Sequence, residues 1–136
     1  MTAVRHVLDV AAVNVILRSP GGAVARDMLR RGLRVQAGAK QRVRANEGIL
    51  RNSIHLASIV TDTGDLGVEI GSDLRYALYV HNGTGVYGQY GSPIVPTHGQ
   101  FLVFTPRGSG RVVFARSVLG QEPNPFLKDA LPLALG

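Results

Sequence analysis

The residues that could carry chemistry are few, and their spacing does not form a reactive group. Four histidines occur along the chain without the spacing of metal ligands: His6, His55, His81 and His98. The 136 residues include no cysteine, which excludes disulfides, thiolate metal sites and cysteine nucleophiles. No serine stands in the Gly-x-Ser-x-Gly arrangement of a nucleophile elbow. We therefore expect no catalysis, no metal site and no cofactor.

Two further motifs are explained by turns and loops. Asp62 and Asp65 lie in the run Thr-Asp-Thr-Gly-Asp, where carboxylates cap a turn. The glycines between Gly83 and Gly91 lack the lysine of a phosphate-binding loop, so they indicate a flexible loop. A hidden hydrolase would need a pocket with perturbed histidines, which the sequence does not predict.

The positive charge is concentrated in the first part of the chain. The net charge is +6; residues 1–58 contain ten basic and three acidic residues, whereas residues 59–136 contain five basic and six acidic ones. This asymmetry predicts a polyanionic neighbour or an acidic partner surface, with a solvated arginine-rich helix face as the alternative. No apolar stretch is long enough to span a bilayer, so we expect a soluble protein that does not contact a membrane and is not exported by the standard route.

A long amphipathic helix is predicted from about residue 21 to residue 43. Ser19 and Pro20 provide a capping hydroxyl and a proline suited to a helix start. With a period of 3.6 residues, one half of the helix is apolar: Val24, Met28, Leu29, Gly32, Leu33, Val35, Ala39 and Val43. The other half carries an arginine stripe, a candidate contact with DNA or a neighbouring subunit: Arg26, Arg30, Arg34 and Arg44. Gly32 and Gly38 weaken the helix but leave room for another element to approach closely.

Short strands are predicted after this helix. Alternating apolar and polar residues indicate a hairpin formed by the later part of residues 49–60 and by residues 66–71. A second hairpin is predicted from residues 101–104 and 112–115. Residues 76–81 suit either a short helix or a strand.

The remaining segments complete an α+β fold. Residues 10–17, which follow Asp9, suit a short helix or a strand. Residues 83–99 are predicted to be a long glycine-rich loop, and residues 125–133 a short C-terminal helix. We expect one α+β domain over residues 1–136, in which residues 1–18 form an N-terminal segment and the long helix packs on a mostly antiparallel sheet.

Four sequence blocks, in order, carry a resemblance to a known family. An amphipathic helix leads into Asn-Glu-Gly-Ile-Leu-Arg-Asn-Ser-Ile at residues 46–54, and Val-Glu-Ile-Gly-Ser follows at 68–72. Tyr-Ala-Leu-Tyr-Val-His-Asn-Gly-Thr occupies residues 76–84, and Pro-Asn-Pro-Phe-Leu-Lys-Asp-Ala-Leu occupies 123–131. The chain resembles the tail-completion (head–tail joining, or neck) proteins of long-tailed bacteriophages, including minor tail protein Z-like sequences.

The chain departs from the family pattern at two places. The usual Asp-Thr is replaced by Asn46 and Glu47, and the usual acid after Tyr-Val is His81. Neither change affects the expected fold, but both put a role for those acids in question.

The resemblance implies a structural virion protein without catalytic residues. It implies a ring, of six copies, between the head connector and the tail tube around the DNA channel. The implied partners are other copies of the chain, connector or stopper proteins and terminator or tube proteins, with a sequence-independent contact to double-stranded DNA left open. The implied location is the virion neck, after assembly in the cytoplasm of the bacterial host.

Two further regions are candidate assembly contacts. In the loop 83–99 the exposed side chains are expected to be Tyr87, Tyr90, Ile94 and Val95, and the alternative is a plain mobile loop. Near the C-terminus, Pro125, Phe126 and Leu127 either dock on a neighbouring subunit or anchor the terminus to their own core; we favour the second.

Other functions remain as alternatives. The arginine stripe suits a small basic nucleic-acid-binding domain, although no aromatic stacking platform or recognised binding motif accompanies it. Within the structural class, a tail terminator or a head stopper is the nearest alternative role.

Overall fold

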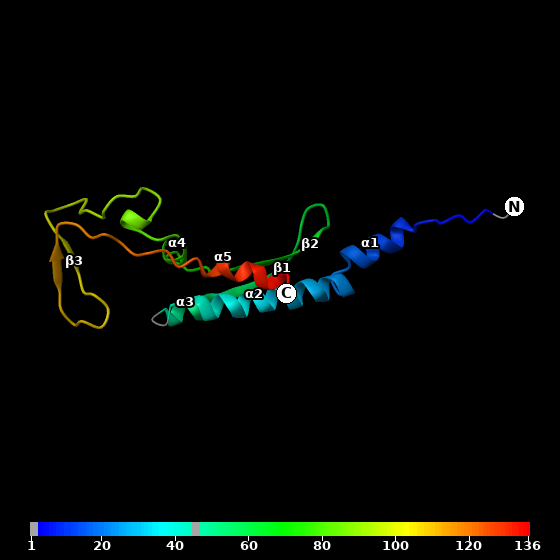
Figure 1. Cartoon of the computed structure of the whole chain (residues 1–136), viewed down its shortest axis with the longest axis horizontal. Coiled ribbons are helices and arrows are strands. Elements are labelled where there is room, and N and C mark those ends of the chain that lie inside the picture. The colour runs from blue at the N-terminus through cyan, green and yellow to red at the C-terminus, as the bar shows by residue number, and fades with distance from the viewer. Residues whose placement is uncertain (1–2, 45–46) are drawn as a thin grey trace.

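The computed structural model describes residues 3–44 and 47–136, and its shape is elongated (Figure 1). Asn46, in the first sequence block, lies outside the described residues. The elements follow in this order: α1 (Val10–Arg18), α2 (Ala23–Arg42), α3 (Gly48–Ser53), β1 (His55–Val60), β2 (Leu66–Gly71), α4 (Ala77–Asn82), a 3₁₀ turn (Gly85–Tyr87), β3 (Leu102–Phe104), β4 (Val113–Ala115), α5 (Phe126–Ala130) and a second 3₁₀ turn (Leu131–Ala134). The predicted α+β class is confirmed.

Two helices separated by a short turn open the described chain. Asp9 caps α1 by accepting a hydrogen bond from the backbone N–H of Ala12 at 3.1 Å, so the helical alternative for this segment is confirmed. The predicted capping role of Ser19 is wrong, because Ser19 ends α1 by donating its backbone N–H to the carbonyl of Val15. Helix α2 begins after Gly22, which provides no side-chain cap.

The core forms where α2 meets the segments that follow it. Val35, Ala39 and Val43 are the buried hydrophobic residues that the α2 region contributes. The other elements supply the rest of the buried core: Leu50, Ile54, Ala77, Val80, Phe126 and Ala130. The apolar half of α2 is wider than the core it covers, since Leu29 and Leu33 remain exposed.

Two glycines of α2 allow close packing, as predicted. A Cβ atom on Gly32 would stand 2.6 Å from Cγ1 of Val68 and 2.7 Å from Cδ1 of Leu56, so this position receives the β1–β2 hairpin. A Cβ atom on Gly38 would collide with the Leu133 side chain. The helix therefore accepts the hairpin at one glycine and the C-terminal segment at the other.

The strands form two separate antiparallel hairpins. In the first, Leu56 pairs with Ile70 and Ser58 pairs with Val68, and the face that carries these residues packs on α2. The expected packing of the long helix on an antiparallel sheet is confirmed for this hairpin. The second hairpin, β3–β4, does not extend this sheet and lies at the far end of the molecule (Figure 1). Arg107, in the turn between its strands, forms an ion pair with Glu47 at the start of α3, with 3.7 Å between Nη1 and Oε1.

Residues 77–82 are helical, which settles the choice between helix and strand left open by the sequence. The predicted C-terminal helix is present as α5 followed by the 3₁₀ turn Leu131–Ala134. Within the described residues, no helix is both long and apolar enough to cross a membrane.

Candidate assembly surfaces

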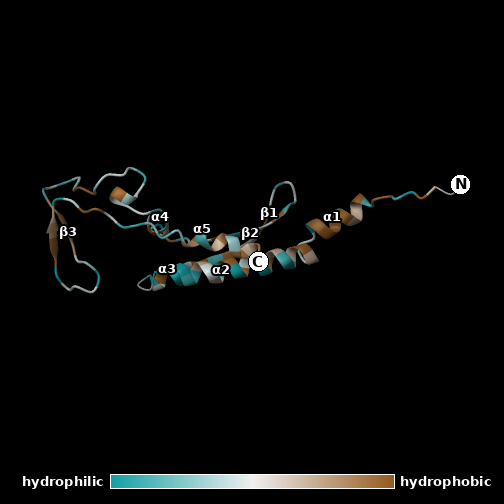
Figure 2. Cartoon of the chain, viewed as in Figure 1, coloured by the Kyte–Doolittle hydropathy of each residue, from teal (hydrophilic) through white to brown (hydrophobic). Residues whose placement is uncertain are grey.

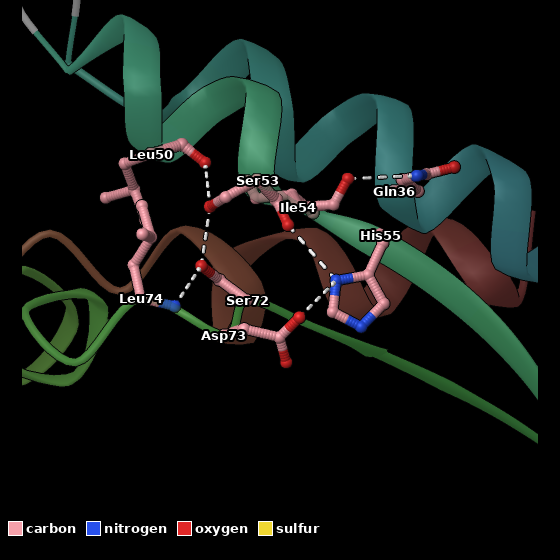
Figure 3. A network of polar contacts seen from close by, with 8 residues as sticks. All are labelled: Gln36, Leu50, Ser53, Ile54, His55, Ser72, Asp73 and Leu74. Atoms are coloured by element: carbon pink, nitrogen blue, oxygen red, sulfur yellow. Dashed lines mark hydrogen bonds and ion pairs between the residues drawn. The ribbon is translucent and has the colours of Figure 1, made fainter.

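A hydrogen-bond chain joins the first and second sequence blocks (Figure 3). The Ser53 hydroxyl donates to the Leu50 carbonyl at 2.7 Å and lies 2.5 Å from the Ser72 hydroxyl. Because the Ser53 proton is used on Leu50, Ser72 donates to Ser53 while accepting the N–H of Leu74 at 3.2 Å. These contacts fix the end of α3 against the segment that leads from β2 to α4.

Two polar side chains complete this junction (Figure 3). Nδ1 of His55 lies 3.1 Å from the Ser53 carbonyl and 3.9 Å from Oδ2 of Asp73; both partners are acceptors, so Nδ1 carries the ring proton. Gln36 on α2 donates to the Ile54 carbonyl at 3.1 Å. The junction is structural, since its polar groups are occupied by one another and by backbone.

The other histidines and acids do not converge on a reactive centre. The His81 ring packs edge-on against Phe126, with the centroids 5.3 Å apart. Thr61, Thr63 and Asp65 hydrogen-bond to one another within the predicted turn. Within residues 3–44 and 47–136, no three His, Asp or Glu side chains are placed to hold a metal ion.

The arginine stripe divides into three exposed members and one anchored member. Among the residues that the structure describes, no hydrogen bond or ion pair reaches Arg26, Arg30 or Arg34. Arg44 instead donates from Nη2 to the Glu122 carbonyl at 2.8 Å and so ties the end of α2 to the C-terminal segment. Of the four arginines in the stripe, the three exposed ones are therefore available to a polyanion or an acidic partner.

Asp27 is the acid beside this stripe. Nε of Arg31 donates a 2.7 Å hydrogen bond to Oδ2 of Asp27. This hydrogen bond lowers the pKa of the Asp27 carboxyl, slight desolvation opposes it, and the positive charges of Arg31, Arg30 and Arg34 lower the pKa further. The carboxylate offsets part of the positive charge but leaves the three exposed arginines without a paired acid.

The residues after α4 leave the body as an arm, which we define as residues 84–121. At its root, the N–H of Thr84 donates to the Gln121 carbonyl and the N–H of Gln121 donates to the Thr84 hydroxyl, each at 2.9 Å. A Cβ atom on Gly120 would collide with the Thr84 carbonyl oxygen, and one on Gly85 would collide with the Leu119 carbonyl oxygen. The two legs of the arm can therefore run side by side, because Gly85 and Gly120 have no side chain where the legs approach each other most closely.

The candidate loop residues all lie on this arm. Tyr87, Tyr90, Ile94 and Val95 are exposed, with Tyr90 at 86%. Ile94 is also paired with Val118 of the returning leg through two backbone hydrogen bonds, so the loop is ordered along part of its length. A pocket of about 400 Å³ lies at the base of the arm, lined by residues that include Leu78, Tyr79 and Tyr90.

The C-terminal candidates lie in the chain's own core. Phe126 is 1% exposed and Leu127 is partly buried against the core, while Pro125 precedes α5. The side chain of Phe126 is thus occupied within its own subunit.

Hydrophobic segments lie at both ends of the molecule (Figure 2), and many of their large side chains are exposed. At one end, α1 has no buried residue and exposes Val15 and Ile16. At the other end, the β3–β4 hairpin exposes Val103 at 60% and Phe114 at 67%. This surface was not predicted from the sequence. The signal for it lies in the two uninterrupted apolar runs 101–104 and 112–115, which lack the polar alternation of a half-exposed strand.

Residues 20–83 match the family model of the HK97-gp10-like proteins, described as "Bacteriophage HK97-gp10, putative tail-component". The matched range is just under half of the chain and contains the first three sequence blocks, apart from Thr84, so the resemblance is confirmed there. No curated protein and no solved structure gives a significant match.

The matched region has the character of a structural phage tail component, a class that is typically not enzymatic. Such a component is located in the virion and contacts other tail or head proteins.

Proposed function

We propose that this protein is a neck or tail-completion subunit of a long-tailed bacteriophage. In this proposal six copies form a ring between the head connector and the tail tube, and the DNA passes through it. The observation that carries the proposal is the tail-component match over residues 20–83. The exposed apolar side chains of α1 and of the β3–β4 hairpin support it, because large exposed apolar patches indicate interaction sites.

The proposal treats residues 1–136 as one unit with two projecting regions. Residues 3–18 and the arm extend from opposite ends of the body, so each copy offers contacts in two directions (Figure 1). The same arrangement would serve a tail terminator or a head stopper, which are alternative roles within the structural class.

The experiment that tests this function is cryo-electron microscopy of purified particles from the source phage. Density for this chain as a ring between connector and tail tube is the expected result. Particles that lack the chain would contradict a virion role, and a ring at the far end of the tail or inside the connector would contradict the neck position.

A second candidate function is supported by Arg26, Arg30 and Arg34, which are exposed and unpaired within the described part of the chain. Arginine side chains bind phosphates without sequence preference, and such binding weakens steeply with salt. A mobility-shift titration of the purified protein with duplex DNA at several salt concentrations tests it. Binding at physiological salt that is lost on Arg26→Glu, Arg30→Glu and Arg34→Glu substitution would favour a nucleic-acid-binding domain, whereas binding only at low salt fits a channel lining.

A further inference from the structure

The β3–β4 hairpin is apolar on both faces. In its register Val103 pairs with Phe114, and their side chains share one face; Leu102, Phe104, Val113 and Ala115 share the other. A two-stranded hairpin is marginally stable in water, and strands that are apolar on both faces belong between two layers. Leu102, Val113 and Ala115 are half-buried within the chain, whereas the face of Val103 and Phe114 is exposed and requires cover from outside.

The more exposed face of the hairpin also carries a positive charge. We call this the arm face: Phe101, Val103, Phe114 and Arg116. The Arg116 guanidinium lies over the Phe101 ring, 5.9 Å from its centroid, which places it on the same side as the apolar residues. The arm contains arginines but no aspartate or glutamate. A fitting partner surface is therefore flat, partly apolar and acidic.

The outer face of the β1–β2 hairpin has this character. Four of the nine acidic residues of the chain fall between positions 62 and 73, within or beside this hairpin. The register pairs Ala57 with Glu69 and Ile59 with Gly67, on the side facing away from α2. We call Ala57, Ile59 and Glu69 the sheet face. All three are exposed, and within the described residues Glu69 has no hydrogen bond or ion pair.

One copy cannot join its own two faces. The arm lies at one end of the elongated molecule, far from the β1–β2 hairpin (Figure 1). The charge complementarity between the faces favours a second copy of this chain over an unrelated protein. A contact between different patches of identical copies is head-to-tail, and its repetition closes into a ring when the rotation allows.

We propose that the arm face of each copy packs on the sheet face of the next copy, with Arg116 beside Glu69 and Phe114 against Ala57 and Ile59. This inference rests on the proposed ring of identical subunits and assigns the surfaces that build it. It leaves α1 for contacts with other virion proteins.

Cross-linking of the full-length protein tests the contact, because the chain has no cysteine of its own. We would combine Ala57→Cys with Phe114→Cys and treat the concentrated protein with a short thiol-specific cross-linker. A head-to-tail contact gives a ladder of trimers and larger species on a denaturing gel. The matched control combines Ala57→Cys with Leu135→Cys, an exposed position outside both faces, and is expected to give no such ladder. A double-cysteine protein that stays monomeric or stops at dimers would overturn the proposal.

Charge reversal tests the pairing that the proposal names. Glu69→Arg and Arg116→Glu should each reduce the trimers and larger species roughly tenfold, since like charges then face each other. Both reversals in one chain should restore the ladder, as should mixing the two single variants. The control reversal Arg30→Glu should leave the ladder unchanged. Failure of the double reversal to restore the ladder would overturn the pairing of Arg116 with Glu69.

The same cysteines in assembled particles separate this inference from the proposed function. A chain that is present at the neck but cross-links from position 114 to a different virion protein would overturn only the arm-to-sheet contact. A ladder formed by a chain that is absent from particles would support the contact and contradict the neck function.

Discussion

The hydroxyl oxygens of Ser53 and Ser72 lie 2.5 Å apart, although the whole β1–β2 hairpin separates the two serines along the chain. Ser72 is the last residue of its sequence block, and Ser53 is the last but one of its own. The hydrogen bond between them gives a structural reason for a serine at each position. The pair holds the end of α3 beside the exit of β2, which sets the direction in which the chain continues into α4.

Removing this pair should lower stability. Ser72→Ala leaves the N–H of Leu74 without its acceptor and takes away the donor to Ser53, so we expect a loss of about 1–2 kcal/mol in the free energy of unfolding. Denaturant unfolding measures it, and the double variant with Ser53→Ala should cost less than the sum of the single changes. Ser117→Ala, at an exposed serine of the arm, is the control and should change stability by no more than about 0.5 kcal/mol. Additive single effects would contradict direct coupling of the two hydroxyls.

Gly32 should not tolerate a side chain. Its Cβ would meet Val68 at 2.6 Å, and the stiff valine on the paired strand cannot easily move aside. Gly32→Ala should therefore destabilise the protein by about 1–2 kcal/mol, although alanine is the better helix former by about 1 kcal/mol. Gly48→Ala in α3 meets open space and serves as the control, with equal or slightly higher stability expected. A more stable Gly32→Ala protein would show that the hairpin does not pack on this face of α2.

Two phenylalanines should differ sharply in their effect on folding. Phe126→Ala should cost about 3–5 kcal/mol, because the side chain is 1% exposed at the centre of the core. Phe114→Ala should change the free energy of unfolding of the isolated subunit by no more than about 0.5 kcal/mol, because the Phe114 side chain faces solvent in the single chain. Calorimetry on dilute protein measures both. Equal losses would mean that the arm already forms part of the fold of the single subunit.

The arm root should respond to a change at Gly120. This glycine has a φ of 100°, and a Cβ atom there would collide with the Thr84 carbonyl oxygen. Gly120→Ala should open the pairing of Thr84 with Gln121 and increase proteolysis and hydrogen exchange along the arm, while the core amides stay protected. Gly91→Ala is the matched control, since Gly91 also has a positive φ of 59° but has open space around its Cβ position. Unchanged exchange at the arm root in Gly120→Ala would contradict the close crossing of the two legs.

The Asp27 carboxyl should titrate below the ordinary aspartate pKa of about 3.9. Because its pKa is lower in the folded state than in the unfolded state, the carboxylate stabilises the fold above the unfolded pKa. That contribution is lost as the pH falls through the folded pKa. A carbon-detected NMR titration measures the pKa, and Arg31→Met should raise it, because the hydrogen bond and the nearest positive charge are both removed. An equal pKa in the two proteins would show that Arg31 is not the main cause.

The local elements of this fold follow closely from the sequence. The apolar period of α2 and the turn residues between β1 and β2 are local signals, and the helix and the hairpin form where these signals predict them. The prediction that Ser19 caps α2 is wrong because its backbone N–H bonds to Val15 at the end of α1. The sequence alone did not decide that α1 is a helix.

The long-range arrangement could not be deduced in the same way. Leu29 and Leu33 share the apolar half of α2 with Val35, yet they are exposed because the small β1–β2 hairpin and the C-terminal segment do not cover the whole helix. The uninterrupted apolar runs of β3–β4 differ from the alternating pattern of β1–β2, but neither pattern says which hairpin packs on α2 and which lies at the far end of the molecule. The pairing of Ser53 with Ser72 likewise depends on how α3 and β2 meet in space.

The position of Phe126 in the sequence has a consequence for synthesis. Leu50 and Ile54 leave the ribosome long before Phe126 and Ala130, and the core that all four share cannot close until the later pair has emerged. A nascent chain therefore remains open while most of it is being translated, and a copy that terminates within the arm never acquires its largest buried side chain. Because cellular proteases degrade unfolded chains, we expect such incomplete copies to be degraded while folded copies persist.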